Sequence, residues 1–155
     1  MFALDPAQAA REMHRVLRPN GRVAIAVWAA RGDNPWLGLL MDSITECTGI
    51  VVPPPGGPGP FALSDADALQ KLFADAEFAE IVVDRVAAPL HSPSFDAWWN
   101  RNLTVAGPVV AVLAGLDDAT RNRVQDTVRA AVARYETSGA LELPGVALLL
   151  TARRP

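Results

Sequence analysis

The sequence is poor in the residues that support disulfide, metal or redox chemistry. Its 155 residues include one cysteine, Cys47, and two histidines, His14 and His91. A lone cysteine excludes an internal disulfide and favours a reducing compartment. Neither histidine has the close spacing to cysteine, histidine or acidic residues that a zinc site needs. We therefore expect a cytoplasmic protein without a metal site.

Excess positive charge and long hydrophobic runs are absent as well. The formal net charge is −3 and Lys71 is the only lysine, so the composition gives no reason to expect nucleic acid or an anionic membrane as partner. The stretch VAGPVVAVLAGL, which starts at Val105, is too short to span a bilayer and contains glycine and proline. Charged Asp5, Arg11 and Glu12 occupy the N-terminal region where a signal peptide would need an apolar run.

Familiar phosphate-binding and nucleophile motifs are missing too. The sequence has no G-x-S-x-G elbow and no Walker motif. The segment PPGGPGP does not qualify as a phosphate loop, because prolines lack the N–H groups that would hold an anion. We expect residues 50–60 to form a flexible Pro/Gly loop.

What the sequence does contain fits one globular α/β domain over residues 1–155. Half of the residues are hydrophobic and 20% are charged. Asp5-Pro6 is a typical helix start, and Asn20-Gly21 predicts a turn after that helix. The following segment, RVAIAVWA, is apolar on both faces of a strand. This pattern predicts an interior strand that is covered on both sides.

Further helices and strands alternate along the rest of the chain. The predicted starts of helices are Asn34-Pro35, Ser64 with Asp67 as a weak capping box, Pro93-Ser94 and Asp117, and a small-residue helix lies around 109–113. EIVVDRVAAPL and GVALLLTARR predict two more strands. Three strands separated by helices predict a layered α/β fold with a helical insert at 93–137.

Few side chains stand out as functional candidates. Adjacent tryptophans on a helix point about a quarter turn apart, so we expect one of Trp98 and Trp99 to face a pocket edge, a neighbouring helix or a partner, with core packing as the alternative. His91 is a better pocket candidate than His14, which we expect at the surface or its boundary. We expect Cys47 to be a small, buried residue that packs like a hydrophobic one.

Several segments, in order, resemble the C-terminal half of class I S-adenosylmethionine-dependent methyltransferases of the UbiE-like, methyltransferase type 11 group. The first segment is LDPAQAAREMHRVLRPNGRVAIAVW. At this place the family usually has an acidic residue that opens a helix, then the motif REM-R-VLRPGG, and then a strand. DNPW resembles ENPF, PFALSDADALQKLFADAEFAEIVVDRV resembles PF-L-D-ALR-LLE-AGF-DV, and LELPGVALLLTARRP resembles the final strand. Asn20 replaces a glycine of PGG.

The resemblance implies a partial Rossmann-like fold. The chain would keep the fifth, sixth and seventh strands in a three-stranded mixed sheet of spatial order 5-7-6, with the seventh antiparallel and helices on the faces of the sheet. It would transfer a methyl group from S-adenosyl-L-methionine to a small molecule. The Gly-rich turn and the acidic residues that bind this cofactor belong to the family's N-terminal half, so no cofactor-binding residue carries over and the catalytic residues stay unknown.

By the same resemblance, this chain supplies the substrate side of the site and is inactive alone. Family enzymes draw substrate walls from the region after the fifth strand and from the helical insert. The pocket candidates are Trp28, Pro35, Trp36, Phe61, His91, Trp98 and Trp99.

The strand at 23–28 would have one edge without a partner in the chain. Such an apolar edge pairs or aggregates. We expect a homodimer, a separately encoded N-terminal half at this edge, or poor stability. Two alternatives stay open: a non-catalytic binding or dimerisation module, and a gene whose true start lies upstream, which the nucleotide sequence before Met1 would test.

Overall fold

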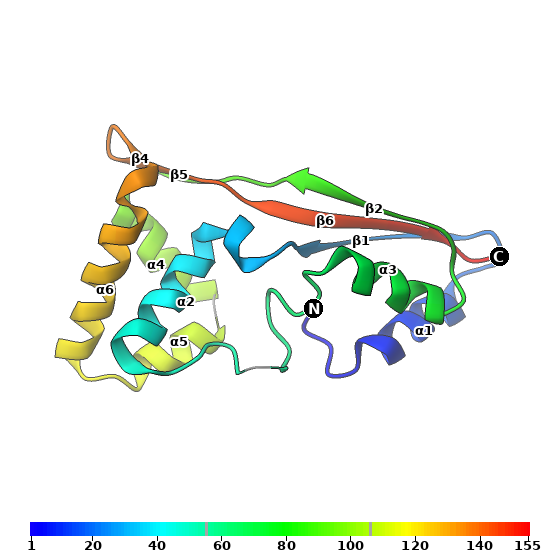
Figure 1. The fold of residues 1–155 in the computed structure, drawn as a ribbon, viewed down its shortest axis with the longest axis horizontal. Coiled ribbons are helices and arrows are strands. Elements are labelled where there is room, and N and C mark those ends of the chain that lie inside the picture. The colour runs from blue at the N-terminus through cyan, green and yellow to red at the C-terminus, as the bar shows by residue number, and fades with distance from the viewer. Residues whose placement is uncertain (55, 106) are drawn as a thin grey trace. The chain divides into compact units, whose positions relative to one another are not determined.

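The computed structural model describes residues 1–54, 56–105 and 107–155. The chain divides into two compact units (Figure 1). Unit 1 comprises Met1–Arg31, Gly56–Ala87 and Val146–Pro155, and unit 2 comprises Gly32–Pro55 and Ala88–Gly145. The α/β fold class is confirmed, whereas the assignment of 1–155 to a single domain stays a prediction.

Unit 1 contains a three-stranded sheet of β1 (Arg22–Trp28), β2 (Ala79–Ala87) and β6 (Val146–Arg153). The strand order is β1-β6-β2, and both pairs are antiparallel. The last strand therefore lies between the two earlier ones, which is the arrangement that the family resemblance implies. Because both pairs are antiparallel, the prediction of a mixed sheet is wrong for this part of the fold.

Two capped helices belong to the same unit. In α1 (Pro6–Val16), the Asp5 side chain accepts a hydrogen bond from the Gln8 backbone N–H at 2.9 Å, as the sequence predicted. In α3 (Ala66–Asp75), the capping side chain is Asp65, which accepts from the Ala68 N–H at 2.9 Å. The prediction of Ser64 as the cap is thus wrong by one residue, because serine and aspartate both suit that role.

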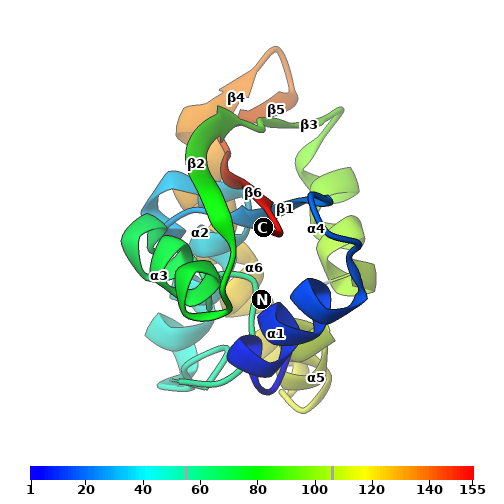
Figure 2. The same cartoon turned by 90° about the vertical axis from the view of Figure 1, so that its right-hand side faces the viewer.

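One face of this sheet is covered by α1 and α3 (Figure 2). The even positions of β6 point to this face and are buried: Leu148, Leu150 and Ala152. They pack with Leu69 and Phe73 of α3 in one hydrophobic core. The alternation of buried and less buried residues along β6 is the period of two that a strand covered on one face requires.

The opposite face of the sheet has no covering helix among the described residues of unit 1. Its exposed side chains are Ala24 and Ala26 of β1 and Val82 and Val86 of β2. Within unit 1, the prediction that residues 22–29 form a strand covered on both sides is therefore not met, because Ala24 and Ala26 are exposed. Alanine is apolar but small, so an apolar run of this kind does not reveal which face is covered.

Unit 2 is mainly helical. Its helices are α2 (Pro35–Thr48), α4 (Phe95–Val105), α5 (Gly107–Ala114) and α6 (Asp118–Val132), with 3-10 turns η1 (Arg31–Asp33) at its border and η2 (Ala133–Tyr135) after α6. α2 ends at Gly49, whose φ of 73° is the left-handed conformation that glycine adopts without strain. The predicted insert at 93–137 is helical over most of its described residues, and residue 106 lies outside them.

A second, smaller sheet was not predicted. It consists of β3 (Leu90–Ser92), β4 (Glu136–Thr137) and β5 (Ala140–Leu143), in the antiparallel order β3-β5-β4. Ser138 and Gly139 join β4 to β5 with φ values of 52° and 86°, the positive pair of a tight hairpin turn. These strands are too short for a hydrophobic period to mark them in the sequence.

The loop at 50–60 falls partly outside the described residues, since residue 55 is among those left out. On either side of it, Val52, Gly59 and Pro60 are buried. The Gly59 N–H donates to the Met1 carbonyl at 3.2 Å. The flexibility of this loop stays a prediction. Across the described residues, every helix falls short of the length and hydrophobicity that crossing a membrane requires.

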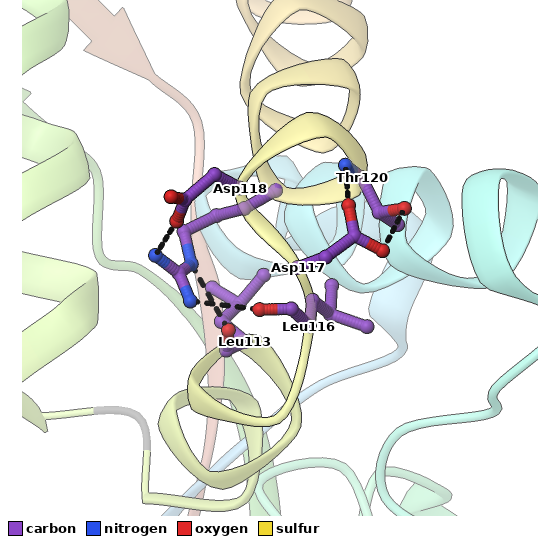
Figure 3. Close-up of polar contacts among 6 residues, drawn as sticks. Leu113, Leu116, Asp117, Asp118 and Thr120 are labelled. Carbon is purple, nitrogen blue, oxygen red and sulfur yellow. Dashed lines mark hydrogen bonds and ion pairs between the residues drawn. The ribbon is translucent and has the colours of Figure 1, made fainter.

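Asp117 caps α6 with two hydrogen bonds, as the sequence predicted (Figure 3). Its carboxylate accepts from the Thr120 N–H at 2.7 Å and from the Thr120 hydroxyl at 3.0 Å. Beside it, Arg121 donates to the carbonyls of Leu113 and Leu116, which joins the end of α5 to the start of α6.

These bonds favour the ionised carboxylate and hold the pKa of Asp117 below its ordinary value, the Thr120 N–H contributing most. A depressed folded pKa gives stability that is present above the unfolded pKa and lost as the pH falls through the folded one. We expect Asp117→Ala to lower the urea midpoint at neutral pH and Asp117→Asn, which retains a capping oxygen, to stay near wild type. Between neutral and acid pH, wild type should lose more stability than Asp117→Asn. Equal losses would contradict the lowered pKa of Asp117 in the folded state.

Candidate functional site

Unit 1 contains a cavity of about 300 Å³ beside β1. Its walls come from the N-terminal segment, α1, β1 and α3. The lining residues are all apolar: Met1, Phe2, Ala3, Pro6, Ala9, Ala10, Met13, Ile25, Ala26, Val27, Leu63, Leu72 and Phe73. A cavity of this size lies at the lower end of the range for small-molecule sites.

Small side chains leave this space open. Ala9 and Ala10 of α1 end at Cβ, so the helix leaves a gap beside the strand. Phe73 closes the inner wall and is only 2% exposed, whereas Phe2 at the rim is 63% exposed. The cavity can therefore take an apolar group, but its lining offers no side chain that could act as an acid or a base.

His14 lies near this core without lining the cavity. It is half-buried, and its ring contacts Phe78 edge-on with ring centres 5.1 Å apart. Its Nε2 atom is buried without a hydrogen-bond partner. The position at the boundary of the core is the one expected from the sequence.

Unit 2 brings together three of the four tryptophans. Trp98 Nε1 donates to the Trp36 carbonyl at 3.0 Å, and Trp36 Nε1 donates to Asn34 Oδ1 at 3.1 Å. Phe95 packs against both Trp98 and Trp99, with ring centres 5.6 Å and 6.2 Å apart. Trp98 is 0% and Trp99 6% exposed, so both members of the pair are buried and neither lies at an open pocket edge.

A close backbone approach accompanies this cluster. Asn34 is fully buried, and a Cβ atom added to Gly145 would lie 3.5 Å from its Oδ1 atom and 2.2 Å from the Ala88 carbonyl oxygen. The Ala88 N–H also donates to the Gly145 carbonyl at 2.8 Å. Only glycine fits here, because any side chain would overlap the Ala88 backbone.

The seven pocket candidates from the sequence do not form one described site. Pro35, Trp36, His91, Trp98 and Trp99 belong to unit 2, whereas Trp28 and Phe61 belong to unit 1. Pro35 is buried at the start of α2, His91 is exposed on β3 and Phe61 is half-buried. Trp28 lines a small hollow of about 180 Å³ with Met1, Ala26, Val27 and Ala147. Their roles as substrate walls stay predictions.

The sequence did not single out the residues that line the cavity beside β1. No pattern distinguishes Ala9, Ala10 and Leu72 from ordinary core positions of an amphipathic helix. The cavity appears only when the helices are placed on the sheet. Among the described residues, no three or more histidine, cysteine, aspartate or glutamate side chains lie close enough together to hold a metal ion.

Structural comparison finds similar solved structures. One is a candidate methyltransferase (BH2331) from Bacillus halodurans C-125, with a TM-score of 0.48 and 14% identity, covering 97% of this chain and 63% of that one. Another is the YcgJ protein from Bacillus subtilis, with a TM-score of 0.49 and 19% identity, covering 97% of this chain and 58% of that one. The likeness is one of fold.

This chain thus spans about three fifths of the length of the structures that it matches. No family model matches it, and no curated protein matches it. At these identities and scores, the similarity says nothing about the reaction or the substrate.

Proposed function

We propose that this chain is the substrate-side half of a cytoplasmic S-adenosylmethionine-dependent methyltransferase that acts on a small molecule. The observation that carries the proposal is the position of β6 between β1 and β2, antiparallel to both. This position supports the interpretation of AREMHRVLRPNGRVAIAVW as the helix and strand that precede the family's last two strands. The lone Cys47 favours a reducing compartment.

The described residues do not fit the cofactor by themselves. S-adenosylmethionine carries ribose hydroxyls and a charged amino-acid group, and a site for it needs hydrogen-bonding and charged partners. The cavity beside β1 has only apolar side chains, and the family's Gly-rich turn is absent from the sequence. This chain therefore does not hold the methyl donor by itself. Its contribution would be to bind and orient the methyl acceptor, which accounts for much of the catalysis in such a transfer.

Calorimetric titration of the purified chain with S-adenosylmethionine tests whether the chain binds the cofactor by itself. We expect no heat beyond dilution, because the chain lacks polar groups to hold the cofactor. Micromolar binding would contradict the proposal that the cofactor residues lie elsewhere. The same titration on an assembly purified with the tagged chain from its native cells should show binding, and transfer of a labelled methyl group should follow.

A non-catalytic module is the second candidate function. The apolar cavity beside β1 favours it, since such a cavity suits recognition of an apolar segment without any chemistry. A native assembly that contains the chain but neither binds the cofactor nor transfers a methyl group would favour this candidate over the enzyme.

A further inference from the structure

Of the 14 lysine and arginine residues in the chain, six arginines gather at one end of unit 1. They are Arg11 and Arg15 of α1, Arg18 in the turn after it, Arg22 at the start of β1, Arg153 at the end of β6, and Arg154. Arg22 lies opposite Arg153 in the β1–β6 pair, and the Arg154 side chain donates to the Arg15 and Leu17 carbonyls. We call this surface, at the end of unit 1 where C is marked in Figure 1, the arginine end.

The arginine end has an excess of positive charge, although the whole chain has a formal net charge of −3. Its acids are fewer than its arginines: Glu12 of α1, and Glu77 and Glu80 near the start of β2, where Ala79 pairs with Arg153. The rest of the chain is therefore strongly acidic. A local excess of one sign attracts partners of the opposite sign and selects among them.

Two of these glutamates show how the arginines hold a carboxylate. Arg15 donates from Nε to Glu12 Oε2 at 2.8 Å and from Nη2 to Glu12 Oε1 at 2.6 Å, which is the two-pronged pairing that a guanidinium offers a carboxylate. Arg153 and Arg22 donate to the two oxygens of Glu80 at 2.8 Å and 3.4 Å. The surface thus already binds carboxylates from its own chain.

Arg11 and Arg18 lie before and after Arg15 along the chain and are both exposed. Neither forms an ion pair with any residue that the structure describes. Their guanidinium groups can therefore bind carboxylates from outside the chain in the same way as Arg15 binds Glu12.

We propose that the arginine end binds an acidic segment of another protein, with carboxylates of that segment paired to Arg11 and Arg18. This goes beyond the proposed function, because it needs neither cofactor nor methyl transfer. A single-stranded nucleic acid fits less well, since it needs aromatic side chains for base stacking and residues 11–22 and 153–154 contain no Phe, Tyr or Trp. Glu12 and Glu80 would also repel a backbone that is charged at every phosphate, whereas an acidic segment can space its carboxylates.

Fluorescence anisotropy of labelled probes tests this surface on the purified full chain. The probes are an oligoglutamate peptide, an oligoglutamine peptide and a single-stranded oligothymidylate, all of the same number of units. We expect the wild type to bind oligoglutamate, more weakly as salt is added, and not to bind oligoglutamine. Binding of oligothymidylate as tight as that of oligoglutamate, or no binding of oligoglutamate, would overturn the proposal.

Two double variants locate the binding. Arg11→Gln/Arg18→Gln should weaken oligoglutamate binding by about fivefold, because two exposed ion pairs are lost. Arg101→Gln/Arg134→Gln removes the same charge at exposed positions of unit 2 and should bind like the wild type. Equal affinities of the two double variants, with circular dichroism showing both folded, would contradict the proposed surface.

Glu12→Gln tests the same surface in the opposite direction. It frees Arg15 from the carboxylate of its own chain, so we expect oligoglutamate to bind about twofold more tightly than to the wild type. Asp126→Asn removes the same charge at an exposed position of α6 and is the matched control. If Glu12→Gln bound no more tightly than Asp126→Asn, recognition of carboxylates at the arginine end would be ruled out.

Discussion

Trp98→Ala should lower the free energy of unfolding by about 3–5 kcal/mol, the range measured for deleting a buried tryptophan or phenylalanine ring. Trp98 is fully buried in unit 2 and packs against Phe95. The substitution leaves a cavity that the neighbouring helices fill only in part. It also removes the hydrogen bond that Trp98 Nε1–H donates to the Trp36 carbonyl at 3.0 Å. Urea unfolding followed by circular dichroism measures the loss.

Trp98→Phe separates the two contributions. It keeps much of the ring volume and removes the N–H, so we expect a loss between wild type and Trp98→Ala, with about 0.5–1.5 kcal/mol from the lost hydrogen bond. Arg101→Ala, at an exposed position of the same helix, should change stability by less than about 0.5 kcal/mol. If Trp98→Ala were as stable as Arg101→Ala, the burial of Trp98 would be contradicted.

Phe73→Ala should destabilise the chain by a similar amount, about 3–5 kcal/mol, through unit 1. Phe73 is 2% exposed, and its ring centre lies 5.2 Å from that of Phe78. Its ring also forms a wall of the cavity beside β1, so the variant enlarges a space that is already apolar. The midpoint and slope of urea unfolding measure the effect, and an enlarged apolar cavity should also increase binding of a small apolar probe such as benzene.

Lys71→Ala is the matched control on the same helix. The Lys71 side chain is 74% exposed and forms an ion pair with Asp75 at 2.9 Å. Exposed pairs of this kind contribute little, so we expect a change of less than about 1 kcal/mol. A loss for Phe73→Ala no greater than for Lys71→Ala would contradict the described core of unit 1.

Helix starts were the features that the sequence predicted best. Asp5 and Asp117 cap α1 and α6 as expected, because a cap depends on a side chain and a backbone N–H only three residues apart. The start of α3 was placed one residue early, since Ser64 and Asp65 are both suitable caps. At Asn34 the helix begins as predicted, but the amide forms no cap hydrogen bond and accepts from Trp36 Nε1 instead.

Burial was predicted less well than secondary structure. The strand RVAIAVW is apolar throughout, yet Ala24 and Ala26 are exposed, because α1 and α3 cover only the other face of the sheet. For Trp98 and Trp99, the structure shows the core packing that the sequence left open as the alternative. Adjacent positions on a helix point in different directions, but Phe95 packs against both rings and both are buried.

The candidate site was not predictable from composition. The aromatic residues singled out in the sequence divide between the two units, whereas the cavity beside β1 is lined by alanines, methionines and other side chains that resemble any hydrophobic core. A cavity depends on what neighbouring elements fail to fill, and this is a property of packing rather than of residue type.

The sequence by itself determined that the chain is α/β, where its capped helices begin and which segments form its longer strands, because caps, turns and hydrophobic periods are local properties. Only the tertiary structure decided that β6 lies between β1 and β2 and that α1 and α3 cover one face of their sheet. These features depend on pairing and covering between segments far apart in the chain, which local patterns do not encode.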